Sequence, residues 1–136
     1  MTDDKLLAEA ARWPVARLAT ISASGVDLVP ITFAMVGSTV VTAVDHKPKT
    51  TRWLRRLENI DRDPRVTILI DHYDDDWSSL WWVRLRGLAR VLDEGLRAAT
   101  AIDQLVAKYP RHYADVPPVG PVIEVDVTEV RTWRAS

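Results

Sequence analysis

The sequence predicts a mainly β fold, an antiparallel barrel of six strands with helices on its flanks. Six segments have the β-branched or alternating composition of strands, and their order is helix, three strands, helix, two strands, helix, strand. Long antiparallel strands dominate a chain of only 136 residues, and closing them into a barrel would remove exposed sheet edges. At this length we expect a single domain over residues 1–136, built around one hydrophobic core.

The composition narrows the classes of function. Lysines and arginines number 18 against 19 acids, so no overall positive field exists to hold a nucleic acid or an anionic membrane, and any anion site must be local. The absence of cysteine excludes a disulfide framework, a thiolate metal site and a cysteine nucleophile. The first twelve residues do not resemble a signal peptide, and no apolar run approaches the roughly 20 residues of a membrane span. We therefore expect a cytoplasmic protein.

In the first half of the chain, turn residues separate short β-branched runs before the period becomes helical. Pro14 ends an initial helix. Turns at 22–25 and 37–38 then divide three strands into a hairpin and a meander. The elements expected here are a helix over 4–12, strands over 15–22, 26–36 and 39–44, and a helix of about three turns whose apolar residues are Trp53, Leu54, Leu57 and Ile60.

The second half contains the longest predicted strand, over 81–92. Its alternate residues place an apolar set that includes Val83 and Leu85 on one face, and a largely cationic set that includes Arg84 and Arg86 on the other. The remaining expected elements are a strand over 65–72 after Asp63 and Pro64, an alanine-rich helix over 95–108, a proline-rich loop over 111–121 and a last strand over 122–133.

A basic turn between the third strand and the second helix is a candidate phosphate site. It contains Lys47, Lys49, Thr50 and Thr51. A helix N-terminus offers unpaired N–H groups and the positive end of the helix dipole, to which lysines and hydroxyls would add further donors. The alternative is that both lysines are solvated and that Thr50 only caps the helix.

Several ordered motifs resemble the pyridoxamine 5′-phosphate oxidase-like split-barrel family over nearly the whole chain. They are Pro30-Ile-Thr-Phe33, the Asp-His-Lys-Pro-Lys turn ending at Lys49, the helix running to Asn59, Asp63-Pro-Arg-Val66 and Trp82-Val-Arg-Leu-Arg-Gly87. The run from Asp71 to Arg84 is similar to an actinobacterial branch of deazaflavin-dependent oxidoreductases, which use coenzyme F420. The resemblance implies a six-stranded antiparallel split β-barrel of the FMN-binding type.

The resemblance also implies a homodimer that holds two cofactors in grooves between the protomers. Lys49 and Lys47, in one turn with Pro48 and Thr50, would grip the cofactor phosphate. The cofactor ring would lie against Pro30, Ile31 and Thr32, beside the strand edge formed by Thr42, Ala43 and Val44. The turn departs from the oxidase pattern, with lysine-proline-lysine for serine-arginine-lysine, and the helix after it is longer. The places of Arg52, Arg56 and Asn59 are therefore open.

Three of the six tryptophans, Trp77, Trp81 and Trp82, fall within six positions. They offer flat apolar surface for a ring or a partner subunit, and Trp77 and Trp82 are candidate cofactor residues; ordinary packing is the alternative. Arg84 and Arg86 could meet an acidic cofactor tail or the partner's carboxylates.

Metal and hydrolase chemistry have little support. The acids at 71 and 74–76 lack the ligand spacing and turn glycine of a calcium loop, so a solvated acidic loop is expected. The three histidines do not have metal-ligand spacing, and no G-x-S-x-G motif occurs.

The resemblance implies an oxidoreductase that transfers a hydride from C5 of reduced F420 to a small, planar substrate. The cofactor would carry the chemistry, so no catalytic side chain is assigned. Two alternatives stay open: an FMN enzyme that reacts with oxygen or a nicotinamide, and a cofactor-binding protein without catalysis.

Overall fold

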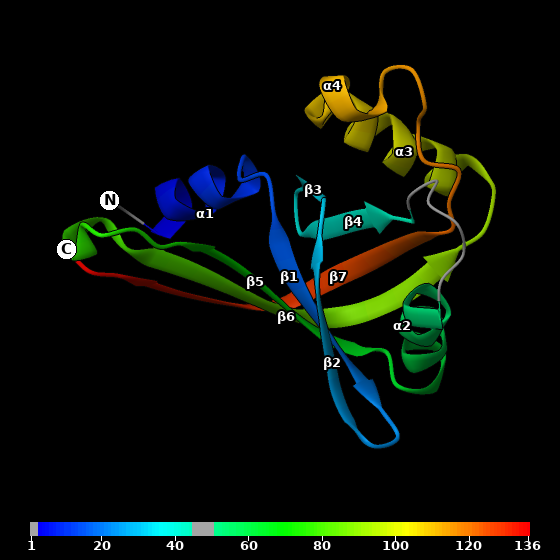
Figure 1. Cartoon of the computed structure of the whole chain (residues 1–136), viewed down its shortest axis with the longest axis horizontal. Helices are drawn as coiled ribbons and strands as arrows, with labels where there is room; N and C mark the ends of the chain where they lie inside the picture. Colours follow the sequence, from blue (N-terminus) through cyan, green and yellow to red (C-terminus); the bar gives the residue numbers. More distant parts are fainter. Residues whose placement is uncertain (1–2, 45–50) are drawn as a thin grey trace.

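The computed structural model describes residues 3–44 and 51–136 (Figure 1). Its elements follow the expected order closely. They are α1 (Asp3–Ala11), β1 (Ala16–Ser22), β2 (Gly25–Ile31), β3 (Ala34–Val36), β4 (Thr39–Ala43), α2 (Thr51–Arg62), β5 (Arg65–His72), the single 3-10 turn η1 (Trp77–Ser79), β6 (Trp81–Leu92), α3 (Leu96–Lys108), α4 (Pro110–Tyr113) and β7 (Val122–Arg134).

The strands form one antiparallel sheet in the order β2-β1-β5-β6-β7-β4-β3. Its two edge strands, β2 and β3, are consecutive in the chain and are separated only by Thr32 and Phe33. The sheet therefore curls until its edges are joined through the backbone itself. The predicted mainly β fold with flanking helices is confirmed. Its strands number seven because the expected strand over 26–36 is interrupted, its first part pairing with β1 and its last part with β4.

Side chains of helix α3 explain the interruption between β2 and β3. Tyr109 follows the last residue of that helix, and its hydroxyl accepts a hydrogen bond from the Phe33 N–H at 3.1 Å. Lys108 Nζ donates to the Phe33 carbonyl at 2.8 Å. The backbone groups of Phe33 are thus satisfied by side chains, so this residue needs no partner strand.

The predicted alternation of β6 is confirmed. Trp81, Val83 and Leu85 are buried, whereas Arg86 and Leu88 on the opposite face are exposed. The inner face packs on α1 and α2 around one apolar cluster, and a second cluster joins β3, β4 and β7 to α3 and α4. The outer face of the sheet keeps apolar side chains in solvent, among them Val26, Leu28, Leu88 and Trp133.

Two short helical turns were not expected from the sequence. The start of the proline-rich stretch, predicted to be loop, forms α4, because Pro110 suits the first turn of a helix. Asp76 caps η1 by accepting a hydrogen bond from the Ser78 N–H. Among the described residues, no helix is long and apolar enough to cross a membrane.

Candidate cofactor site

A pocket of about 340 Å³ lies between the β1–β2 hairpin and helix α2, and we call it the β2–α2 pocket. It forms where β2, an edge strand, leaves one side open beside the helix. Its walls combine apolar strand residues with two arginines of α2. The lining residues are Thr20, Asp27, Leu28, Val29, Pro30, Arg55 and Arg56.

Arg56 is the residue of this pocket that most clearly lacks a partner. Its Nε is buried, and within the described part of the chain nothing accepts a hydrogen bond from it. Burial lowers the pKa of its guanidinium from the ordinary value, although arginine keeps its charge in proteins. A buried donor without an acceptor costs free energy. An anionic ligand in the pocket would supply an acceptor for the Arg56 Nε.

The polar floor of the pocket is held by Asn59. Its Nδ2 donates to Thr20 Oγ1 at 2.9 Å and to Asp27 Oδ2 at 2.8 Å. Asn59 and Thr20 are both buried, so the bond between them is shielded from water. The two bonds fix the helix against the hairpin. Arg55 Nη1 lies 4.0 Å from the other oxygen of Asp27.

Of the three predicted ring residues on the second strand, Pro30 lines the β2–α2 pocket and is exposed. The Ile31 side chain points inward and belongs to the hydrophobic core. Thr32 lies past the end of β2, where its hydroxyl is 2.8 Å from that of Tyr113. Contact of a ring with these residues stays a prediction.

The predicted strand edge at Thr42, Ala43 and Val44 has buried side chains, so only its backbone could meet a ligand. The Val44 N–H donates to the Pro121 carbonyl, toward the side where β7 lies. Neighbouring residues of a strand point their backbone groups to opposite sides, so those of Ala43 point toward β3. The β3 ladder ends at Val41, and among the described strands none pairs with Ala43 on that side.

The tryptophan candidates lie elsewhere. Trp77 is 69% exposed in η1, and Trp82 is half-buried on the outer face of β6, opposite Trp133 of β7. The Arg84 guanidinium lies 5.6 Å from the centre of the Trp82 ring. Figure 1 shows the β5–β6 connection at one end of the long axis and α2 at the other. One protomer therefore does not bring Trp77 and the β2–α2 pocket together.

The predicted phosphate-binding residues Lys47, Pro48, Lys49 and Thr50 lie outside the described residues. Helix α2 begins directly after them, at Thr51. Sequence reasoning did not identify Asp27 or Arg55 as site residues and left Arg56 unplaced. The only sequence signal for the two arginines is helical spacing, which sets Arg55 and Arg56 one turn before Asn59.

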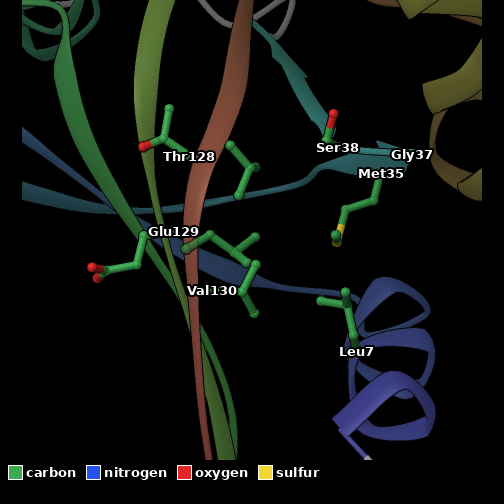
Figure 2. Close-up of a pocket in the computed structure, with 9 residues that line it drawn as sticks. Leu7, Met35, Gly37, Ser38, Thr128, Glu129 and Val130 are labelled. Atoms are coloured by element: carbon green, nitrogen blue, oxygen red, sulfur yellow. The ribbon is translucent and has the colours of Figure 1, made fainter.

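A second, apolar pocket of about 220 Å³ lies between α1, β3 and β7. Figure 2 shows Leu7, Met35 and Val130 pointing toward one space, while the Glu129 carboxylate points away from it. No lysine or arginine in the described part of the chain lines this pocket, so its described lining offers no cation for a phosphate. In the described residues, no group of three acids or histidines could hold a metal ion.

Comparison with solved structures shows the same fold in other bacterial proteins. A conserved hypothetical protein of Mycobacterium tuberculosis matches with a TM-score of 0.78 and 17% identity over 99% of this chain and 86% of its own. A FAD-binding protein of Mesorhizobium loti matches with a TM-score of 0.74 and 16% identity over 100% and 96%. A heme binding protein of Mycobacterium smegmatis matches with a TM-score of 0.66 and 25% identity over 93% and 53%.

No curated protein matches the chain. A family model does: the one described as pyridoxamine 5′-phosphate oxidase aligns with residues 2–134. That alignment spans every strand of the sheet and the whole β2–α2 pocket, and it agrees with the resemblance that the motifs indicate. The chain therefore belongs to the pyridoxamine 5′-phosphate oxidase family, with its split-barrel fold.

Proposed function

We propose that the protein is an oxidoreductase that binds the deazaflavin coenzyme F420 in the β2–α2 pocket and acts on a small, planar organic substrate. The observation that carries this proposal is the buried Nε of Arg56, which has no partner among the described residues, in a pocket that Pro30 also lines. A cationic donor without an acceptor, next to an exposed apolar residue, suits a ligand with both a phosphate and a flat ring.

Each part of the site has a role in binding. Arg55 and Arg56 would hold the phosphate. Lys47 and Lys49, which precede the N-terminus of α2 in the sequence, would add positive charge there, together with the positive end of the helix dipole. The backbone groups of Ala43, with which no described strand pairs on the β3 side, would bond the polar edge of the ring. When bound, the reduced deazaflavin supplies a hydride from its C5. The protein supplies orientation of ring and substrate, so no side chain need act as a strong acid or base.

The proposal includes a homodimer. The β5–β6 connection, which contains Trp77, and helix α2, which lines the β2–α2 pocket, lie toward opposite ends of the protomer (Figure 1). Trp77 and the pocket could therefore contact one cofactor only if Trp77 came from a second copy. The outer face of the sheet supports such pairing, because it exposes Leu28, Leu88 and Trp133. Arg84 on the same face has a buried Nε that finds no acceptor among the described residues.

A flavin is the second candidate ligand. The FAD-binding protein of Mesorhizobium loti shares the fold over nearly its whole length, which favours testing FMN and FAD beside F420. A protein that binds either cofactor without turnover would use the same pocket. Cofactor binding and catalysis must therefore be measured separately.

The deciding experiment is a parallel titration of the purified protein with F420, FMN, FAD and heme, followed by quenching of tryptophan fluorescence. We expect micromolar affinity for F420 and weaker binding of the other three. Preference for FMN or FAD would replace the cofactor assignment, and binding of heme alone would reject the proposal. Oxidation of reduced F420 by planar enones or nitro compounds would then distinguish an enzyme from a binding protein.

A further inference from the structure

We infer that Asp27 selects ligands by accepting hydrogen bonds from a polyhydroxyl chain, such as the ribityl chain that joins a flavin or deazaflavin ring to its phosphate. This inference rests on the proposed function and names a specificity residue within the same pocket. It starts from an unusual combination, a carboxylate in a pocket whose other charged groups, among the described lining residues, are two arginines.

Asp27 lies on the strand that carries Pro30, and its carboxylate faces Arg55 of the helix. It precedes Pro30 by three residues on β2, which is about 10 Å along a strand. Residues three apart point to opposite faces of a strand, yet both line the pocket, because β2 is an edge strand and the pocket wraps around its open side. A ligand with its ring at Pro30 and its phosphate at Arg55 and Arg56 would pass its connecting chain by Asp27.

The carboxylate is oriented and has acceptor capacity left. Oδ2 accepts one bond from Asn59 at 2.8 Å, and Asn59 is itself held by the buried Thr20. Among the described residues, the nearest ion-pair partner of Oδ1 is Arg55 Nη1 at 4.0 Å, beyond hydrogen-bond distance. Each carboxylate oxygen can accept two hydrogen bonds, so hydroxyl groups entering the pocket would find free lone pairs.

The charge of Asp27 argues for a ligand with donors. For a purely anionic ligand, a carboxylate beside the arginines would only weaken binding by repulsion. An Asp27–Arg55 pair that is this long and partly solvated contributes little to stability. Hydroxyl groups on the ligand would offset this repulsion by donating to Asp27, since hydrogen bonds to a charged acceptor are among the stronger ones in proteins. The pocket thus matches a ligand that has one phosphate and several hydroxyls.

The test compares three ligands: lumiflavin, which is the bare ring, riboflavin, which adds the ribityl chain, and FMN, which adds the phosphate. The matching deazaflavins replace them if F420 is preferred. The wild-type protein should bind the ribityl-bearing ring more tightly than the bare ring. Asp27→Ala should reduce that preference roughly tenfold and leave the affinity for the bare ring unchanged. Asp27→Asn keeps one acceptor oxygen and should lie between the two.

A matched control is Asp61→Asn, which removes the same charge from the exposed side of α2. It should leave all three affinities unchanged. If Asp27→Ala weakens the bare ring and the ribityl ring equally, or weakens neither, the inference is overturned while the cofactor proposal stands. If the wild-type protein binds none of these rings, both are overturned.

Discussion

Arg56 decides whether the β2–α2 pocket is an anion site. Replacing it by glutamine removes the cation whose buried Nε has no described partner. We expect cofactor affinity to fall by about 1.5–3 kcal/mol, as for a hydrogen bond to a charged group, with the free energy of unfolding unchanged or slightly raised. Isothermal titration calorimetry measures the cofactor affinity, and urea denaturation measures the free energy of unfolding. Arg62→Gln, on the exposed end of the same helix, is the control, and equal affinities for the two variants would contradict this role.

Lys108 predicts a dependence of stability on pH. Burial lowers its pKa from 10.5 to about 8, although its ammonium donates to the Phe33 carbonyl and lies 3.5 Å from the centre of the Phe33 ring. Between pH 8 and about 10 the unfolded chain therefore binds more protons than the folded one, so the free energy of unfolding gains a rising term from Lys108.

Lys108→Met should flatten that rise. Tyr109 must be considered because its own pKa is raised by burial, so it holds its proton in the folded state and acts in the opposite direction above pH 10. Urea denaturation between pH 7.5 and 9.5 avoids most of that contribution. A wild-type curve with the same slope as the variant would show that Lys108 titrates normally.

At the scale of elements, the bulge between β6 and β7 depends on Gly87. The register shifts between Arg86 and Gly87, and a Cβ on Gly87 would lie 2.2 Å from the Asp126 carbonyl oxygen and 2.8 Å from Val125 Cγ1. Backbone atoms cannot move aside as a flexible side chain does. The two strands therefore approach so closely that only glycine fits without rearrangement.

Gly87→Ala should reduce the free energy of unfolding by about 1–3 kcal/mol, the usual cost of overpacking. Chemical denaturation measures it. Leu88→Ala, at the exposed neighbouring position, places the same residue type in the strand without the clash and should cost much less. If both variants lose the same free energy of unfolding, strands β6 and β7 can move apart at Gly87 with little cost in stability.

At the scale of the whole molecule, the outer sheet face predicts a homodimer. Trp133 is 44% exposed and lies opposite Trp82, and burying such aromatic surface is a main source of interface stability. Trp133→Glu should convert the dimer to a monomer in analytical ultracentrifugation, while Trp133→Phe should not. A monomeric wild-type protein would refute the proposed pairing.

If Trp77 of the partner subunit completes the site, the oligomeric state and cofactor binding should change together. The Trp133→Glu monomer would then lose tryptophan quenching by the cofactor, since the partner's Trp77 would no longer reach the ring. Retained quenching in the monomer would place the whole site within one protomer.

Most elements were predictable because their signals are local. The alternation of Val83 with Arg84, and of Leu85 with Arg86, follows from the period of a strand alone. The motifs from Pro30 to Gly87 were likewise enough to indicate the family that the alignment over residues 2–134 shows. The expected phosphate turn and the cofactor identity stay predictions.

What only the tertiary structure decided depends on segments that are distant in sequence. The strand over 26–36 breaks at Phe33 because Tyr109 and Lys108, about 75 residues later, satisfy its backbone. Likewise the pocket exists because Arg56 and Asn59 of a helix meet Asp27 and Thr20 of a hairpin. The sequence by itself determined the elements and their faces, since periodicity is a property of neighbouring residues. The site required the fold, because long-range contacts decide which polar groups are left without a partner.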